Sequence, residues 1–437
     1  MIVCKFGGSS VADSNQIKKV ANILTSHEAR RIAIVSAPGK RNSEDIKITD
    51  MLYTCQRLTS EGKSMTTEFG QIRTRYLEIA QDLELSTESL AAQIDEIEKN
   101  LLAGAGPDYA ASRGEFLSAQ VIAASMGWEF LDTQTYIFLN DDGTVDEKSY
   151  QLLADAIDDT KNYILPGFYG SGTDGKVKTF SRGGSDITGA IAARSVGAEL
   201  YENWTDVSGI RMADPRIVDD PAVVNELTYQ EIRELASVGA NVFHEEAIAP
   251  VRSVQIPICV KNTNDPESAG TMMGPSRDTS TLPIVGISGK TGYCRLHIKK
   301  HFLNKEADYK LKLETILKVY GIVPEFSSDG FDSLSCYFKQ KLLRDQEGLI
   351  GRIVEELSPD EIDTEEQIAM IGLVGEGLYE ARGILGDVSS ALAAEGIAIR
   401  YLSYGGSMIT CIIGVYDHEY LHALKVMYKA VSEKYVS

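Results

Sequence analysis

The sequence predicts an α/β protein with a mostly parallel sheet, followed by two smaller βαββαβ units. Two observations support this prediction. Residues 1–283 alternate short apolar runs with amphipathic helical patterns, which is typical of a sheet covered by helices on both faces. In residues 284–437 the same order of predicted elements occurs twice: strand, helix, strand, strand and helix. The length of 437 residues suits two or three domains with large cores.

The first predicted strand leads into a glycine loop. Residues 2–6 form an apolar run that contains Lys5, and Gly7, Gly8 and Ser9 follow it. The helical spacing that comes next is kept by Ile17, Val20, Ala21 and Leu24. Glycines let backbone N–H groups approach an anion, and a helix N-terminus favours negative charge. With the lysine, this pattern predicts a phosphate site. It differs from the P-loop, in which the lysine follows the glycines.

Further elements of the first region follow in order. Residues 31–36 read as a buried strand that ends in a polar loop, and residues 63–103 read as charged surface helices. A second strand-to-loop edge is expected at residues 163–168, and Asp174 with Gly175 indicates a hairpin.

Two helix starts are predicted after the hairpin. Ser185 and Asp186 are expected to cap a helix whose apolar face contains Ile187, Ala190 and Ile191. Thr228 and Glu231 have the spacing of a capping box.

The remaining chain predicts a linker and the two repeated units. Residues 271–283 are rich in Gly, Pro, Ser and Thr and read as a linker. We therefore expect domains at 1–283, 284–364 and 365–437. The helices of the two units are expected near 311–320, 346–356, 386–395 and 419–431. Residues 358–367 are acidic and read as a solvated connector.

The composition of the chain argues against several classes of protein. The formal net charge of -20 argues against nucleic acid as a partner and means that anionic ligands must meet locally placed cations. No apolar run approaches the length of a membrane span, and a strand predicted from residue 2 leaves no room for a signal peptide. The six cysteines are scattered without a C-x-x-C motif, so we expect reduced core thiols in a cytoplasmic protein.

Three further motifs contain residues that could bind a ligand. In the run 180–186, Arg182 offers a planar fork that fits a carboxylate, and Asp186 either caps the helix or holds Lys5. Glu115 is expected at a helix start, where it either complements the dipole or binds a substrate ammonium. Residues 202–216 form a strand end and a long polar loop, and long ordered loops are often functional.

Taken together, these motifs resemble the aspartokinase family within the amino-acid kinase fold. The chain has K-F-G-G-S-S at 5–10, G-E-F-L-S at 114–118, R-G-G-S-D at 182–186 and W-T-D-V-S-G-I-R-M-A-D-P-R at 204–216. The C-terminal repeats look like the ACT domains of that family. The resemblance therefore implies a three-layer αβα sandwich with two ferredoxin-like ACT domains.

The resemblance also implies a reaction. It is phosphoryl transfer from MgATP to the β-carboxylate of L-aspartate, which gives 4-phospho-L-aspartate and begins lysine, threonine and methionine biosynthesis. The magnesium would be held by phosphates and waters, without a protein metal cluster. The implied catalytic residues are Lys5 and Asp186; the implied aspartate-binding residues are Ser36, Thr49, Glu115, Arg182 and Ser185; and the implied nucleotide-binding residues are Lys5, Gly7, Gly8, Ser9, Thr205, Asp206, Arg211, Arg216 and Lys261.

Regulation is implied by the ACT-like repeats. In the family such domains pair between subunits and bind an end-product amino acid, so we expect a homodimer or a dimer of dimers. Lysine is preferred over threonine as the effector, because its side-chain ammonium needs carboxylate partners. The expected effector site contains the strand 322–326 and the residues Asn304, Glu306, Asp308 and Glu325.

Two other functions stay open. Another amino-acid kinase, such as a glutamate-type kinase, would share the first loop but lack the motif at 204–216. A non-catalytic amino-acid sensor would keep the repeats but lose Lys5, Arg182 or Asp186. The chain also departs from the family pattern at Ser208, Arg211 and Asn241, changes that bear on adenine packing and nucleotide affinity.

Overall fold

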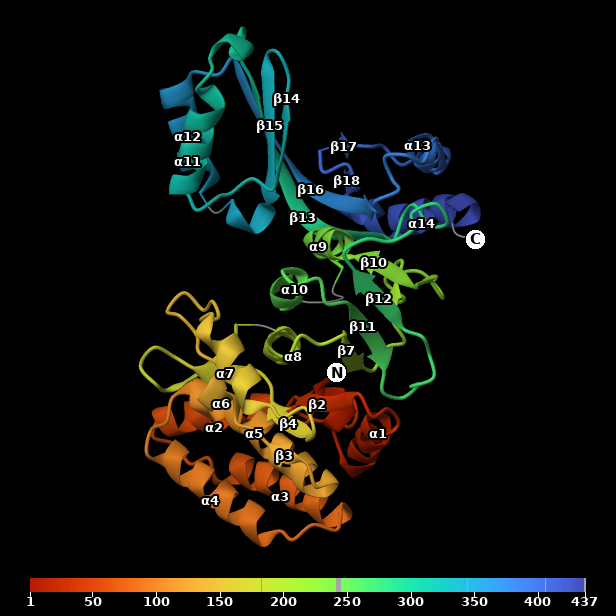
Figure 1. Ribbon diagram of the computed structural model, residues 1–437. Coiled ribbons are helices and arrows are strands. Elements are labelled where there is room, and N and C mark those ends of the chain that lie inside the picture. Colours follow the sequence, from red (N-terminus) through yellow and green to blue (C-terminus); the bar gives the residue numbers. More distant parts are fainter. Residues whose placement is uncertain (182, 241–244, 344, 405, 436–437) are drawn as a thin grey trace. The chain divides into compact units, whose positions relative to one another are not determined.

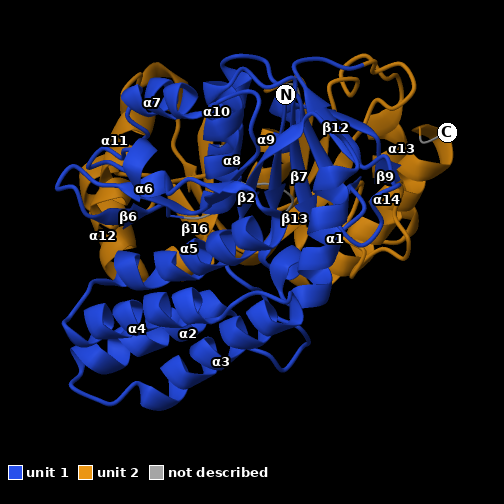
Figure 2. Ribbon diagram, turned by 60° about the horizontal axis from the view of Figure 1, so that its bottom comes forward, with its two compact units in different colours: residues 1–210, 223–232, 241–277 blue, residues 211–222, 233–240, 278–437 orange. Residues whose placement is uncertain are grey.

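The computed structural model describes residues 1–181, 183–240, 245–343, 345–404 and 406–435 (Figure 1). These residues divide into two compact units (Figure 2). Unit 1 contains residues 1–210, 223–232 and 241–277, and unit 2 contains residues 211–222, 233–240 and 278–437. All six cysteines are buried and unpaired, as expected.

Unit 1 is built on an eight-stranded sheet in the order β10-β12-β11-β7-β1-β2-β4-β3. Its strands are β1 (Ile2–Phe6), β2 (Arg30–Val35), β3 (Glu129–Phe130), β4 (Tyr163–Pro166), β7 (Leu200–Thr205), β10 (Glu226–Thr228), β11 (Ile258–Asn262) and β12 (Thr271–Gly274). Neighbouring strands are parallel except β11 and β12. The predicted mostly parallel sheet is confirmed. The linker expected from residue 271 is wrong at its start, because Thr271–Gly274 forms the strand β12.

Helices cover both faces of this sheet (Figure 1). One layer contains α1 (Ser14–Thr25), α2 (Ile48–Ser60) and α5 (Pro107–Met126), with α3 (Thr66–Asp82) and α4 (Glu88–Leu102) outside them. The other layer contains α7 (Lys148–Ala156), α8 (Gly184–Ser195) and α10 (Glu245–Arg252), and the short α6 (Thr133–Tyr136) lies at the edge. The three-layer prediction is therefore confirmed, and the main core lies between the sheet and the first layer.

Two local predictions in unit 1 are also confirmed. Strands β5 (Tyr169–Ser171) and β6 (Val177–Thr179) form an antiparallel hairpin, and Gly175 adopts a φ of 75° in its turn. Helix α9 (Tyr229–Ser237) begins with the predicted capping box. The Glu231 amide donates to the Thr228 hydroxyl at 3.1 Å, and the Thr228 amide donates to the Glu231 carboxylate at 2.9 Å. The remaining short strands are β8 (Ile210–Arg211) and β9 (Val223–Val224).

Unit 2 is built on an antiparallel sheet of six strands in the order β14-β15-β13-β16-β18-β17. The strands are β13 (Gly286–Lys299), β14 (Phe326–Asp329), β15 (Ser333–Lys339), β16 (Glu361–Val374), β17 (Tyr401–Tyr404) and β18 (Thr410–Tyr416). The helices are α11 (Tyr309–Val319), α12 (Gln346–Leu357), α13 (Ile384–Ala394) and α14 (Tyr420–Tyr435). The two predicted strand-helix repeats are confirmed. The long strands β13 and β16 run through both halves and join them into one sheet.

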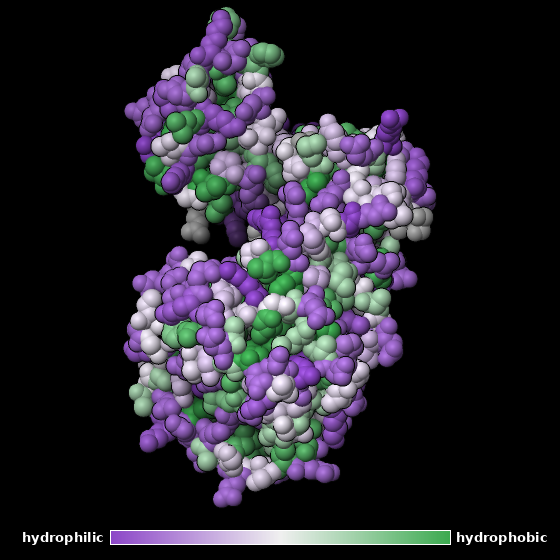
Figure 3. Space-filling model, in the orientation of Figure 1, coloured by the Kyte–Doolittle hydropathy of each residue, from purple (hydrophilic) through white to green (hydrophobic). Residues whose placement is uncertain are grey.

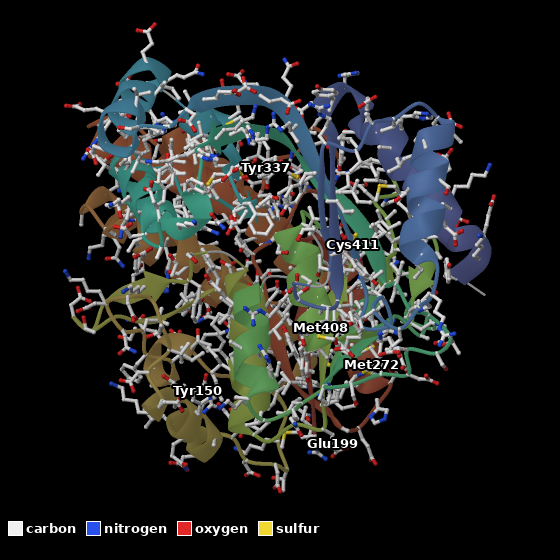
Figure 4. All side chains as sticks on the ribbon, turned by 90° about the horizontal axis from the view of Figure 1, so that it is seen from above. Tyr150, Glu199, Met272, Tyr337, Met408 and Cys411 are labelled. Carbon is white, nitrogen blue, oxygen red and sulfur yellow. The ribbon has the colours of Figure 1, made fainter. Side chains whose placement is uncertain are left out.

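Side-chain alternation explains the first half of this sheet. Cys294, Leu296 and Ile298 of β13 point into a core with α11 and α12. On the opposite face, Arg295 pairs with Glu365 at 3.2 Å. Tyr337 of β15, labelled in Figure 4, is buried on this face. The expected connector at 358–367 is wrong, because residues 361–367 are part of β16.

The visible surface is largely polar, with scattered apolar residues (Figure 3). Figure 3 shows hydrophilic residues over much of the visible face of both units. Within the described ranges, no helix combines the length and apolar character that a membrane span requires.

Candidate active site at the ends of the parallel strands

Lys5 and Asp186 meet at the carboxyl end of β1. Lys5 Nζ lies 2.5 Å from Asp186 Oδ1, and the two side chains are only 11% and 14% exposed. Parallel strands of an open α/β sheet end at the same edge, where ligands bind in such folds. Of the two alternatives for Asp186, the structure therefore shows the ion pair with Lys5.

Asn203 completes this cluster. Its Nδ2 donates to Asp186 Oδ1 at 2.9 Å, and Lys5 Nζ donates to its Oδ1 at 3.5 Å. Asn203 is not among the residues predicted from the sequence. The available signal was a buried amide in the run Glu202–Thr205, and its significance appears once β7 pairs with β1, because Asn203 is then in register with Lys5. A buried charge is tolerated only with such partners.

Helix α8 presents Asp186 from its first turn. The helix begins after Gly183, which has a φ of 59°, and no side chain caps it. The predicted cap from Ser185 and Asp186 is therefore wrong, because Asp186 Oδ1 is bound by Lys5 and Asn203 instead. Ser185 is buried against Gly167, where a Cβ would lie 2.5 Å from the Ser185 hydroxyl.

The glycine loop follows β1 as predicted, but helix α1 does not follow it directly. Residues Gly8–Val11 form a 3-10 turn, and α1 begins at Ser14 with Asp13 as its cap. The first N–H groups of a helical turn have no partner inside the turn. Ser10 shares a hydrogen bond of 2.7 Å with the buried Thr263, which anchors the far side of the turn.

The loop after β2 lies against the glycine loop. The Gly39 amide donates to the Gly8 carbonyl at 2.8 Å, and the Ser36 amide donates to the Phe6 carbonyl at 3.1 Å. Thr49 is the second residue of α2. The structure thus brings Ser36 to the end of β1, with Thr49 on the helix that ends this loop.

Glu115 is a buried carboxylate within α5. Its predicted position at a helix start is wrong, because α5 begins at Pro107. The side chain is buried, and its Oε2 has no hydrogen-bond partner among the described residues. Burial raises the pKa of Glu115 to about 8, against the smaller opposing effects of the Ala37 amide and the Arg113 charge. A buried acceptor without a donor indicates a ligand that brings one.

The other residues predicted to bind aspartate or the nucleotide lie on several elements of unit 1 or outside the described residues. Arg182 and Asn241 lie outside the described residues. Phe180 and Ser181 line a cavity of about 560 Å³ with Ile187 and Glu246. Thr205 is the last residue of β7, and Asp206 follows it. Lys261 Nζ on the neighbouring strand β11 lies 5.2 Å from the centre of the Trp204 ring.

Two arginines predicted for the nucleotide belong to unit 2. Arg211 pairs with Asp220 at 2.8 Å, and Arg216 pairs with Asp214 at 2.6 Å. Arg216 is 85% exposed, so its guanidinium is held by an acid of its own loop without burial.

The residues predicted for the effector fall into two groups within unit 2. Glu306 pairs with Lys300 at 3.1 Å, Asp308 pairs with Lys312 at 2.8 Å, and the Asn304 amide donates to the carbonyl of Phe331, beyond the last residue of β14. Glu325 precedes β14 and accepts a hydrogen bond of 2.6 Å from Tyr293. The structure therefore does not bring Glu325 together with the other three.

The chain is similar to known proteins over nearly its whole length. The model of the amino acid kinase family matches residues 1–262, and the model of the ACT domain matches residues 371–431. Aspartokinase 3 of Bacillus subtilis is 35% identical, with 98% of each chain covered. Lysine-sensitive aspartokinase 3 of Escherichia coli is 26% identical over 93% of this chain and 94% of that protein.

Solved structures agree with these matches. The crystal structure of aspartate kinase from Clostridium acetobutylicum is 41% identical, has a TM-score of 0.91 and covers 98% of this chain and 100% of its own. Aspartokinase III of E. coli in complex with aspartate and ADP has a TM-score of 0.77 at 22% identity, with 99% of both chains covered. At 22% identity, the similarity to the E. coli enzyme shows a shared fold.

Proposed function

The chain belongs to the aspartokinase family, and we propose that it transfers the terminal phosphoryl group of ATP to the β-carboxylate of L-aspartate. It is an aspartate kinase with ACT regulatory domains. The observation that carries the proposal is the Lys5–Asp186–Asn203 cluster at the edge where the parallel strands end. In the proposed pathway, the product 4-phospho-L-aspartate begins lysine, threonine and methionine synthesis.

The proposed reaction needs positioning and charge neutralisation more than a base. The β-carboxylate of aspartate is ionised at neutral pH, so no side chain has to remove a proton. The difficulty is that a carboxylate must approach a polyphosphate. Lys5 would offset this repulsion, because its ammonium is held by Asp186 and Asn203 in a buried setting.

The residues around Lys5 fit a nucleotide phosphate. A Cβ at Gly7 would be in van der Waals contact with Lys5 Nζ at 3.6 Å, so the glycine lies directly beside the ammonium. ATP would supply the phosphoryl group, with Gly8 and Ser9 also contacting its phosphates. Mg²⁺ would be held by the phosphates and by water, because this ion keeps several waters and binds substrate phosphates in kinase sites.

Two groups would hold the ends of the amino acid. Glu115 has a buried oxygen without a donor, which suits the substrate ammonium. Arg182 would take the α-carboxylate, a proposal that rests on the sequence motif. E. coli aspartokinase III has been solved with aspartate and ADP, and these ligands match the proposed substrate and product nucleotide here.

A coupled assay of ADP release tests the reaction. We expect ADP release with aspartate and not with glutamate or acetylglutamate. Release with glutamate alone would support a glutamate-type kinase, and no release with any acid would support a non-catalytic sensor. A Lys5→Ala preparation measured in parallel controls for contaminating kinases.

We also propose feedback inhibition through unit 2, with lysine preferred over threonine as the effector. A lysine-sensitive relative is 26% identical, and Glu306, Asp308 and Glu325 offer carboxylates for a side-chain ammonium. The proposed domains remain 1–283, 284–364 and 365–437, and the proposed assembly is a homodimer or dimer of dimers. The buried free cysteines suit a cytoplasmic, reducing location.

Titration of lysine and threonine, singly and together, against the initial rate tests this regulation. Because Glu325 precedes β14 and Glu306 lies near its other end, Glu325→Gln and Glu306→Gln distinguish the two ends. The variant that weakens inhibition by lysine marks the effector site. Inhibition by threonine alone would overturn the preference for lysine, and no response to either would overturn the regulation.

A further inference from the structure

Arg75 lies on α3, outside the Lys5–Asp186–Asn203 cluster. Its side chain is only 5% exposed, although arginine is rarely buried without partners. Its Nη2 donates to the carbonyl of Ala12 at 3.0 Å and also to the carbonyl of Gly39. Its Nη1 donates to the carbonyl of Ile46 at 3.3 Å. One guanidinium thus binds three backbone carbonyls.

These carbonyls come from three different segments, one of which is the end of the glycine loop. Ala12 ends the 3-10 turn of the glycine loop, Gly39 lies in the loop after β2, and Ile46 precedes the helix that carries Thr49. Asp45 joins the same group, because its carboxylate lies 3.0 Å from Arg75 Nη1. Arg41 and then Arg75 hold the pKa of Asp45 well below its usual range, so this carboxylate stays ionised.

The segments joined by Arg75 already touch one another. A Cβ on Gly39 would lie 2.7 Å from the Gly8 carbonyl carbon, so the two loops are in backbone contact. A small change in one loop therefore displaces the other. Displacement of reacting groups by about 1 Å can cost on the order of 100-fold in rate.

We propose that Arg75 is a positioning residue that holds the phosphate-binding loop and the aspartate-binding loop in register for phosphoryl transfer. The inference rests on the proposed function, since it assigns these loops to ATP and aspartate. A lysine could not replace Arg75, because an ammonium on a flexible stem lacks the planar fork that reaches carbonyls on several sides. The adjacent Tyr76 acts similarly on α5, since its hydroxyl donates to the Gly114 carbonyl at 2.6 Å, next to Glu115.

The test compares Arg75→Ala, Arg75→Lys and the wild-type enzyme by kcat, by KM for each substrate and by thermal unfolding. We expect Arg75→Ala to lower kcat/KM for both ATP and aspartate by about 30-fold or more. Arg75→Lys should recover little of this loss. Millimolar guanidinium should restore activity to folded Arg75→Ala by filling the space of the side chain, an effect that a general loss of stability would not produce.

Arg73→Ala is the matched control. Arg73 lies on the same helix, but it pairs with Asp95 and Glu98 on α4, away from the loops. Its kcat/KM should stay within about twofold of the wild type, with or without guanidinium. Folded Arg75→Ala with near-normal kcat/KM would overturn the inference. So would a loss that follows the unfolded fraction and resists guanidinium.

A binding measurement separates this inference from the proposed function. Calorimetric titration with a non-hydrolysable ATP analogue and magnesium does not depend on which acid is phosphorylated. Weaker binding of both the analogue and aspartate to folded Arg75→Ala supports the inference. Unchanged binding of both would contradict it. Inactivity of the wild-type enzyme with aspartate would instead contradict the proposed function.

Discussion

Lys5 Nζ and Asp186 Oδ1 lie 2.5 Å apart, and Asn203 binds both partners. Side chains of the protein itself therefore hold the ammonium in place. A preorganised charge costs little reorganisation when the transferring phosphoryl group develops its charge. This arrangement predicts that Lys5 acts mainly in the transition state.

Lys5→Ala should lower kcat by about 100- to 1,000-fold, while KM for ATP changes less, because the lost interaction strengthens during transfer. Steady-state kinetics with both substrates measure the split. Lys19→Ala is the control, since Lys19 is an exposed lysine of α1 whose ammonium donates to Asn264 at 2.7 Å. Near-normal kcat with a raised KM for ATP would show that Lys5 only binds nucleotide.

Gly39→Ala should impair the enzyme through the contact between the two loops. The added Cβ would meet Gly8 backbone atoms at 2.7 and 2.9 Å, and backbone cannot move aside as a flexible side chain can. We expect kcat/KM to fall about tenfold or more, with a destabilisation of about 1–3 kcal/mol.

Gly70→Ala is the matched control for Gly39→Ala. Gly70 lies within α3, and a Cβ there meets no atom within 4 Å. This variant should keep full activity and gain about 0.5–1 kcal/mol of stability, because alanine favours the helix. If Gly39→Ala behaved like Gly70→Ala, the loop contact would be unimportant.

Arg277 and Glu231 form a buried ion pair whose effect should appear in stability. The pair has two short contacts of 2.7 and 2.6 Å, and the side chains are 2% and 0% exposed. Arg277→Met should destabilise unit 1 by about 3–5 kcal/mol, because it leaves a buried carboxylate without its guanidinium. Denaturant unfolding measures the loss.

The double variant Arg277→Met with Glu231→Met removes both charges and should recover part of that stability. The recovery is incomplete because Glu231→Met also removes the acceptor of the Thr228 amide in the capping box. Glu231→Met alone measures that second loss. A double variant less stable than Arg277→Met by the full loss of Glu231→Met would contradict this account.

The part of the site that can be predicted from the sequence consists of residues that are neighbours in the chain. Lys5, Gly7 and Gly8 were found because a strand, a lysine and a glycine pair are adjacent in the chain. Asn203 could not be found this way, because its role depends on the pairing of β7 with β1 across almost 200 positions. The contacts of Arg75 could not be predicted for the same reason, since its three carbonyl partners lie 29 to 63 positions away.

Two predictions about the fold were wrong, and each has a physical cause. Composition suggested a linker at 271–283, yet Thr271–Gly274 pairs in the sheet through its backbone, for which Gly and Thr suffice. Acidity suggested a connector at 358–367, yet the acids of β16 face cations on β13. Lys299 lies 2.5 Å from Glu361, and such cross-strand pairs stabilise a charged strand.

The Glu115 carboxyl should make the stability and the activity of the protein depend on pH. Burial raises the pKa of this carboxyl to about 8 in the folded chain, compared with an ordinary value of 4.5. Between these values the folded state holds a proton that the unfolded state has lost. Stability from this group is therefore present below pH 4.5 and is lost as pH rises toward 8.

Glu115→Gln removes this penalty and should be more stable than the wild type near pH 8, with a difference that shrinks toward pH 5. The same variant tests substrate binding. An ionised Glu115 is needed for the aspartate ammonium, so wild-type kcat/KM for aspartate should rise almost tenfold per pH unit below about 8 and then level. Glu115→Gln should show a low value without this rise. A wild-type profile that is flat from about pH 6 to about pH 9 would contradict the assignment of Glu115 to the ammonium.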